Sequence, residues 1–182
     1  MNKERIKHYI DNECITFTFN SEMLEDFDQY HKKMHPRRKK QALHFMGKKR
    51  TGLLPSWNII LNVGKRTVQN SRKQTISEYT KYILDCTSEH METLKRCAVV
   101  VKQYHPTKTK FDLDNIHTKS SFDAFSEHEI WDDDNVYVLE PLIFTGGHDK
   151  ENPRTEIIIL PITDEYDRDF VLLCIVDILK NK

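Results

Sequence analysis

Two groups of aspartates are the residues of this chain whose types and spacing could do chemistry. The first is Asp112-Leu113-Asp114-Asn115, and the second is Trp131-Asp132-Asp133-Asp134. Side chains alternate between two faces of an extended backbone, so the two carboxylates of Asp-x-Asp would lie on one side of the chain. A helix between the two groups would turn the chain back, and a third carboxylate could then meet the first two.

Three converging carboxylates need a counter-cation. Two carboxylates about 4 Å apart repel by roughly 4 kcal/mol at an effective dielectric constant near 20, so the group must take up a proton or a cation. Between the two aspartate groups the only Lys or Arg is Lys119. A hard cation such as Mg²⁺ suits oxygen ligands, and its open positions would take a phosphate oxygen and a water. Taken singly, Asp114 as an N-cap, Lys119 and Asp123 as an i,i+4 pair and the triple aspartate as an acidic turn are common structural features.

Other metal motifs fit less well. Asp112, Asp114 and Asp123 stand at positions 1, 3 and 12 of a calcium-binding loop, but Ile116 and His117 occupy positions 5 and 6, where an oxygen ligand and glycine are needed. His31 and His35 are four residues apart without a His-Glu-x-x-His context, and we interpret them as part of an exposed helix face. The sequence contains no Walker loop and no Gly-x-Gly-x-x-Gly.

Charge is unevenly distributed along a chain that is neutral overall. Residues 29–77 contain thirteen Lys or Arg and no acid, while residues 111–170 contain sixteen acids and four Lys or Arg. This pattern predicts a basic face that contacts phosphates and an acidic site, although two solvated faces of opposite sign are the alternative. The predicted phosphate-binding residues are Arg37, Arg38, Lys39, Lys40, Lys48, Lys49, Arg50, Lys65 and Arg66.

The cysteines and the hydropathy pattern indicate the compartment. Cys14, Cys86, Cys97 and Cys174 are far apart, which favours free thiols in a reducing compartment. No signal peptide is evident, and the longest apolar run is too short to span a bilayer. We expect a cytoplasmic, soluble protein.

The order of the predicted elements indicates an α+β fold, with a mixed β-sheet of about four to five strands packed with helices. Strands are predicted at 14–19, 98–101, 136–139 and 156–160, and the connection 145–153 is interpreted as a hairpin loop. Helices are predicted after Asn20 or Ser21, over 74–96, after Asp114 and towards the C-terminus. Asp114 is expected to cap its helix. The C-terminal helix is expected to pack on the sheet or in a dimer seam, with a final edge strand as the alternative.

The aspartate groups resemble those of the RusA family of Holliday-junction resolvases. The resemblance rests on Asp112-Leu113-Asp114-Asn115, Lys119-Ser-Ser-Phe-Asp-Ala and Ile130-Trp131-Asp132-Asp133-Asp134, and extends more weakly to Leu54-Pro55-Ser56-Trp57-Asn58. This chain has one extra residue before its lysine, so Thr118 occupies the lysine position if no gap is allowed. Asp133-Asp134 is our preferred match to the family's Asp pair, with Asp132-Asp133 as the alternative.

The resemblance implies a homodimeric, Mg²⁺-dependent endodeoxyribonuclease, with Mn²⁺ as an alternative ion, that resolves four-way DNA junctions by paired nicks in recombination and repair. Members are commonly encoded by phages and prophages. Asp112, Asp114 and Asp134 would be the metal-binding catalytic residues, and Lys119 would stabilise charge on the phosphate. The chain would be one RusA-like domain, 1–182, with a basic helix-loop insertion at about 20–52 and a helical extension at about 163–182. The rival hypotheses are a junction- or DNA-binding protein without cleavage activity and a metal-dependent enzyme acting on nucleotides.

Overall fold

A computed structural model gives the fold of residues 3–37, 40–46, 51–87, 92–108 and 110–180, which are the residues described below. It is an α+β fold with a four-stranded mixed sheet in the order β1-β4-β2-β3, as predicted. The strands are β1 (Ile15–Phe19), β2 (Cys97–His105), β3 (Leu139–His148) and β4 (Arg154–Pro161). The helices are α1 (Lys3–Asn12), α2 (Ser21–Met34), α3 (Trp57–Leu61), α4 (Arg66–Thr87), α5 (Lys119–Glu127) and α6 (Arg168–Lys180), with 3-10 turns η1 (His44–Met46) and η2 (Leu113–Asn115).

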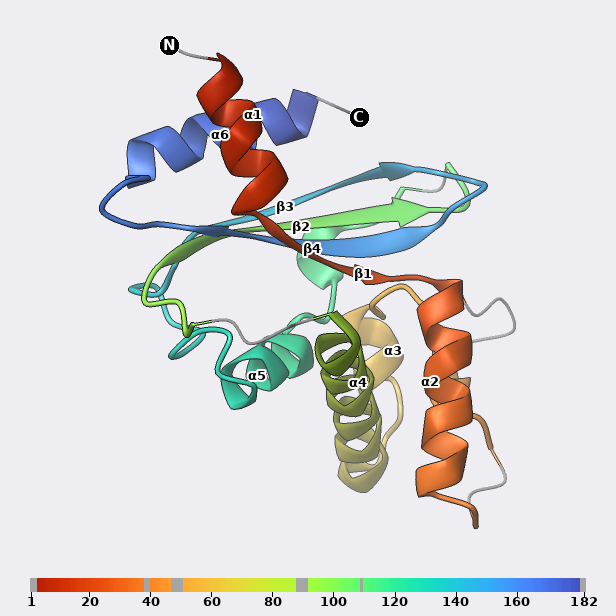
Figure 1. Cartoon of the computed structure of the whole chain (residues 1–182). Coiled ribbons are helices and arrows are strands. Elements are labelled where there is room, and N and C mark those ends of the chain that lie inside the picture. The colour runs from red at the N-terminus through yellow and green to blue at the C-terminus, as the bar shows by residue number, and fades with distance from the viewer. Residues whose placement is uncertain (1–2, 38–39, 47–50, 88–91, 109, 181–182) are drawn as a thin grey trace.

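Helices cover both faces of the sheet (Figure 1). α1 and α6 lie on one face, and α2 to α5 lie on the other. β2 is buried on both faces, and its residues alternate between two apolar cores, Val99 and Val101 facing one and Ala98 and Val100 facing the other. Because both faces are covered, β2 consists of consecutive apolar residues rather than an alternating pattern.

The sheet topology corrects one prediction. β2 pairs in parallel with β3 and antiparallel with β4, so β3 and β4 are not neighbours and the predicted hairpin at 145–153 is wrong. The chain instead passes the end of β2, where the Asp149 backbone N–H donates to the His105 carbonyl at 2.9 Å. The physical reason is that β2, as the strand buried on both faces, takes a neighbour on each edge.

The predicted strand at 136–139 is also corrected, because β3 begins only at Leu139. Val136 and Tyr137 are exposed, and the Asn135 side chain accepts the Tyr137 backbone N–H at 2.8 Å. An asparagine bonded to its own backbone forms a turn that competes with strand pairing.

The predicted helices formed with shifted ends. The Asn20 side chain caps α2 by accepting the Met23 backbone N–H at 2.9 Å. α4 begins at Arg66 and ends at Thr87, earlier at both ends than the predicted 74–96. The helix at the N-terminus, α1, was not predicted. Among the described residues, no helix is long and apolar enough to cross a membrane, and all four cysteines are free thiols.

Gly52 fixes the turn that precedes α3 against the start of α2. Its φ is +74°, and a Cβ built there would lie 1.8 Å from the Asn20 carbonyl oxygen. A side chain at this position would separate the two segments, and its φ is one that favours glycine.

We therefore expect Gly52→Ala to lower the free energy of unfolding by at least about 2 kcal/mol. Gly64 is the matched control, because a Cβ there meets nothing within 4 Å, and Gly64→Ala should change stability by less than about 1 kcal/mol. Urea unfolding of both variants measures the difference. Equal effects would show that the contact between Gly52 and Asn20 does not matter.

Candidate functional site

The chain between β2 and β3 carries both aspartate groups. After β2 it forms η2, then α5, and then a loop that returns to the sheet. The turn before α3 is joined to it, because Ser56 forms a β-bridge with Ile116 and the His117 backbone N–H donates to the Pro55 carbonyl at 2.8 Å. The Pro-Ser turn and the first aspartate group, far apart in sequence, therefore lie side by side.

The first aspartate group is not an extended strand. Asp112 is extended, with φ −89° and ψ 121°, but Asp114 lies inside the 3-10 turn η2. The Asn115 backbone N–H donates to the Asp112 carbonyl at 3.1 Å and closes that turn. The period-2 argument for Asp-x-Asp is therefore wrong, as is the prediction that Asp114 caps the next helix, whose N-cap is Thr118. Both carboxylates are exposed, and within the described residues neither makes a hydrogen bond or ion pair.

Lys119, the first residue of α5, joins the helix to the second aspartate group. Its ammonium donates to Asp123 Oδ1 at 2.7 Å and to Asp134 Oδ2 at 2.8 Å. The hydrogen bond to Asp123, followed by that to Asp134, raises the pKa of Lys119. Because the Lys119 side chain is 56% exposed, the pair with Asp134 contributes at most about 1 kcal/mol to stability. Thr118, by contrast, is buried and carries no charge.

The three consecutive aspartates have different partners. Asp132 accepts from the Lys95 ammonium at 3.0 and 2.9 Å. Asp133 accepts from the Asn135 side chain and from the Asp134 backbone N–H, and these bonds lower the pKa of Asp133. Asp134 alone meets Lys119 among the three. This geometry favours Asp134 as the carboxylate nearest the start of α5.

A tryptophan anchors this acidic loop. Trp131 is fully buried and stacks on Phe125 with ring centroids 4.9 Å apart. Its indole N–H donates to Ser126 Oγ at 2.9 Å. The aspartates that follow Trp131 are therefore held at a fixed distance from α5.

The predicted metal site is not assembled as one cluster. In the part of the chain that the structure describes, the only three His, Cys, Asp or Glu residues with ligand atoms within 4.8 Å of one another are His31, His35 and Glu78. Asp112, Asp114 and Asp134 form no such group. Their carboxylate oxygens nevertheless have the chemistry that Mg²⁺ prefers, and two of the three have no competing partner among the described residues.

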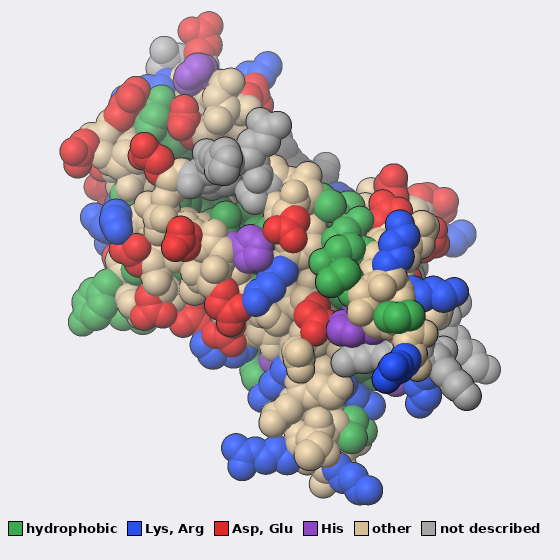
Figure 2. Space-filling view, turned by 60° about the horizontal axis from the view of Figure 1, so that its bottom comes forward, with side chains coloured by type: hydrophobic (Ala, Val, Ile, Leu, Met, Phe, Trp, Pro, Cys, Tyr) green, Lys and Arg blue, Asp and Glu red, His purple; other side chains and the backbone are tan. Residues whose placement is uncertain are grey.

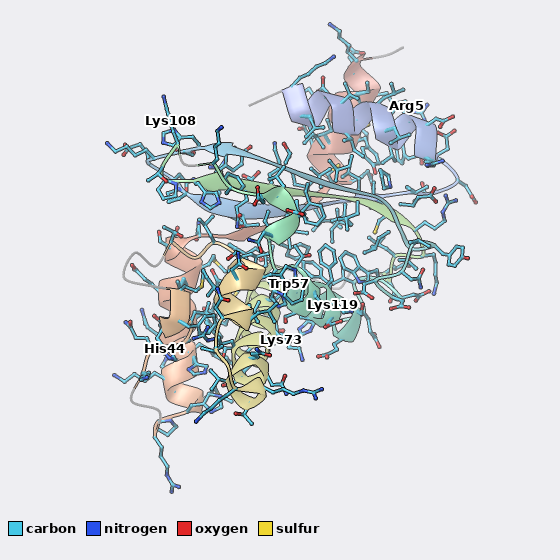
Figure 3. All side chains as sticks on the ribbon, turned by 180° about the vertical axis from the view of Figure 1, so that it is seen from behind. Arg5, His44, Trp57, Lys73, Lys108 and Lys119 are labelled. Carbon is cyan, nitrogen blue, oxygen red and sulfur yellow. The ribbon has the colours of Figure 1, made fainter. Side chains whose placement is uncertain are left out.

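Trp57 and Lys73 lie beside the start of α5, near Lys119 (Figure 3). His117 is fully buried, its Nε2 is 2.7 Å from Ser120 Oγ, and its ring meets Trp57 edge-on at 4.2 Å. The Lys73 ammonium lies over the Trp57 ring, 5.7 Å from its centroid. Lys73 was not predicted as a site residue; its position at the end of the acid-free segment was the only signal.

A pocket of about 430 Å³ adjoins Asp112 and Asn115. Gln103 and His105, from the end of β2, and Lys110 also line it. The Gln103 amide donates to the Leu54 carbonyl at 2.8 Å and to Thr155 Oγ1 at 3.1 Å. Sequence reasoning missed Gln103 because its partners, Leu54 and Thr155, become its neighbours only in the folded chain.

Four of the nine predicted phosphate-binding residues are described, namely Arg37, Lys40, Lys65 and Arg66, and all four are exposed. The other five, Arg38, Lys39, Lys48, Lys49 and Arg50, lie outside the described residues. The end of α2 and the start of α4 both lie away from the sheet (Figure 1), but Met34 and His35 at the end of α2 line a pocket with Glu78 and Lys81, from the second half of α4. On the face shown in Figure 2, acids gather mainly on one side, with Lys and Arg along the lower and right-hand edges.

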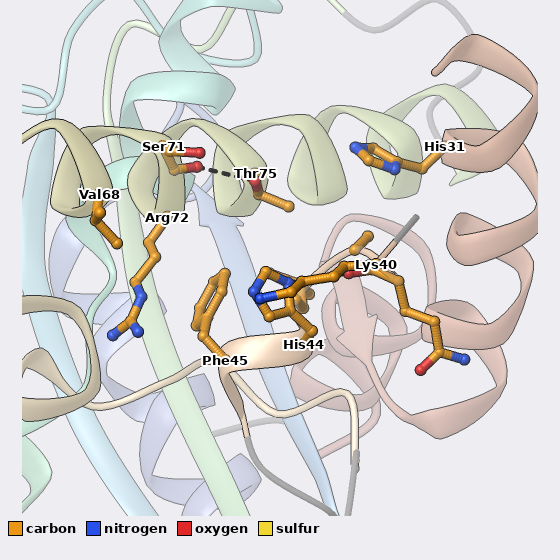
Figure 4. A pocket seen from close by; sticks show the side chains of 11 residues that line it. His31, Lys40, His44, Phe45, Val68, Ser71, Arg72 and Thr75 are labelled. Atoms are coloured by element: carbon orange, nitrogen blue, oxygen red, sulfur yellow. Dashed lines mark hydrogen bonds between the residues drawn. The ribbon is translucent and has the colours of Figure 1, made fainter. Parts of the chain in front are cut away.

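A second pocket lies between η1 and α4 (Figure 4). It has a volume of about 360 Å³ and is lined by Lys40, His44 and Arg72 among others. The Arg72 guanidinium donates to the Ile59 carbonyl and lies 5.1 Å from the Phe45 ring centroid. This arrangement of cations and an aromatic ring was anticipated only as a general property of the basic stretch.

No protein-family model and no curated protein matches this chain.

The stability of the site region should depend on pH through His117. Burial, followed by the charge of Lys73, lowers the pKa of His117 from 6.5 to about 4. The folded chain then keeps His117 neutral while the unfolded chain takes up a proton. The contribution to stability is full above about pH 6.5 and is lost as the pH falls towards 4, by up to about 3 kcal/mol.

Urea unfolding between pH 7 and pH 4 measures this loss. His117→Gln should show a flatter decline than the wild type over that range, whatever its stability at pH 7. His148→Gln, at an exposed position, is the control and should keep the wild-type slope. A wild-type slope in His117→Gln would contradict the assignment.

Proposed function

We propose that this protein is a RusA-like, Mg²⁺-dependent endodeoxyribonuclease that resolves four-way DNA junctions by paired nicks. The observation that carries the proposal is the contact of Lys119 with Asp134, which brings together the lysine and the third carboxylate that the resemblance implies. Asp112 and Asp114 precede the same helix and keep exposed carboxylates. The free thiols are in keeping with action in a reducing cytoplasm.

Each residue has a role that its position supports. Asp112, Asp114 and Asp134 would hold Mg²⁺, which supplies polarisation of the phosphate and a more acidic water when it is bound. Lys119 holds Asp134 at the start of α5, where the positive end of the helix also favours an anion. Its ammonium, with a raised pKa, stays charged and can donate to a phosphate oxygen.

The exposed cations at the start of α4 support DNA as the substrate. Lys65 and Arg66 lie at the start of α4, and the first turn of that helix contains no acid. Cations there do not stabilise the helix, because its N-terminal end is already positive. Together they make a surface suited to phosphates, and a two-fold homodimer would match the approximate symmetry of a four-way junction.

A binding protein without cleavage activity is the alternative that one observation favours. Asp134 is paired with Lys119 rather than grouped with Asp112 and Asp114. If that pairing persists with metal and DNA present, only two carboxylates remain for the metal. Junction cleavage and junction binding, measured separately, distinguish this alternative from the nuclease.

Asp114→Asn should reduce nicking of a synthetic four-way junction in Mg²⁺ by at least about 100-fold, because a metal-binding charge is lost. Junction binding, measured by gel shift in EDTA, should be unchanged or stronger. Asp132→Asn is the matched control, since Asp132 pairs with Lys95, and it should nick normally. Nicking by Asp114→Asn at the wild-type rate would overturn the site, while a wild type that binds but never nicks would favour the binding protein.

The double variant Lys65→Gln/Arg66→Gln should weaken binding to any DNA sequence. If each side chain contacts one phosphate, the slope of log affinity against log salt should fall in magnitude by roughly 2. Lys3→Gln/Lys7→Gln, on α1 across the sheet, is the control and should keep the slope. An unchanged slope in the first variant would remove this end of the molecule from the DNA interface.

A further inference from the structure

Two histidines and a glutamate from different helices meet between α2 and α4. His31 lies in the last turn of α2, His35 follows the helix, and Glu78 projects from α4. One ligand atom of each lies within 4.8 Å of the other two. Figure 4 shows His31 between α2 and α4.

The backbone sets the two histidines on one side of α2. The His35 backbone N–H donates to the His31 carbonyl at 2.9 Å, so the last turn stays closed. The imidazole ring centroids are 4.6 Å apart. Histidines four residues apart on one helix face are a known pair of zinc ligands. The sequence analysis set this pair aside because it lacks a His-Glu-x-x-His context, and interpreted it as part of an exposed helix face, whereas His31 is buried.

Glu78 supplies the third ligand and is oriented for it. Its Oε1 accepts from the Gln74 side chain at 3.1 Å. Its Oε2 faces His31 Nε2 at 3.5 Å and is a buried oxygen that has no hydrogen-bond partner among the described residues. A buried carboxylate oxygen with no partner is costly, and a cation between the two residues would remove that cost.

The distances suit a tetrahedral ion. Zn²⁺ bonds of about 2.0–2.2 Å at tetrahedral angles place ligand atoms roughly 3.3–3.6 Å apart. His31 and Glu78 already have this separation. A rotation of the half-buried His35 side chain would bring its imidazole to the same separation from the other two.

The ligand types select the ion. Imidazole nitrogens suit Zn²⁺ and similar transition metals, whereas Mg²⁺ prefers oxygen. All three residues line one pocket of about 280 Å³, which Lys81, Asp85 and His128 also line. A water or small anion in that pocket would be in reach of the fourth coordination position.

We propose that His31, His35 and Glu78 bind one Zn²⁺-class ion that ties the end of α2 to α4, separately from the carboxylate site. It adds to the aromatic packing of Phe27 against Tyr79 and Tyr82, which joins the same helices. The ion would hold the end of α2, which leads into the basic segment at residues 37–50.

Calorimetric titration of the chelator-treated protein with Zn²⁺ tests the proposal. The wild type should bind one ion per chain, with a rise in the melting temperature. His35→Gln and Glu78→Gln should each weaken binding on the order of 100-fold or more, and His148→Gln should not. Circular dichroism checks that each variant is folded, and His35 is only partly buried, so that His35→Gln leaves the core intact.

Co²⁺ in place of Zn²⁺ adds a second readout, since a tetrahedral site with nitrogen ligands absorbs visible light. The absorption should appear in the wild type and be lost in His35→Gln. Absence of stoichiometric binding, or equal binding by His35→Gln, would overturn the proposal; His31 and Glu78 would then be an ion pair only. Neither outcome depends on DNA cleavage, so a failed nuclease assay leaves this test intact.

Discussion

The burial of β2 on both faces is the constraint on which the rest of the structure depends. A strand with apolar side chains on both faces needs helices above and below it and a partner strand at each edge. β2 has helices on both faces and is flanked by β3 and β4. Its two neighbours run in opposite directions, so the chain must leave the sheet after β2 and return to begin β3 alongside it. The segment that makes this excursion carries both aspartate groups. The position of the candidate site is therefore a consequence of sheet topology.

Three lysines surround the aspartates of the candidate site. Lys119 holds one carboxylate, Lys95 holds another, and Lys73 lies above Trp57 beside a histidine that stays neutral. The ion pairs are largely exposed, so they contribute little to stability and can exchange partners at little cost. Such pairs keep the loop ordered, and under the proposed function they would release a carboxylate to the metal ion. Rigid parts of the site come instead from apolar contacts, above all the stacking of Trp131 on Phe125.

Patterns within one element could be predicted from the sequence, and relations between elements could not. The alternating residues of β1, the apolar run of β2 and the Asn20 cap all gave correct elements because their signals are local. The hairpin prediction failed because nothing near 145–153 shows that β2 lies between β3 and β4. Val136 was assigned to a strand on β-propensity, yet the Asn135 side chain turns the chain there. The pair of Lys119 with Asp123 follows from its i,i+4 spacing, whereas the contact of Lys119 with Asp134 and that of Glu78 with His31 depend on how separate segments pack.

The contact between Gly52 and Asn20 determines how the basic segment is attached. The segment leaves the C-terminal end of α2, and Gly52 brings the chain back to the N-terminal end of the same helix, about 21 Å away for 14 residues. The chain on either side of this segment is therefore attached at opposite ends of α2. Lys40, a described cation of the segment, lines a pocket with Arg72 of α4. A cation attached in this way loses less conformational entropy on binding an anion than one on a free arm would lose.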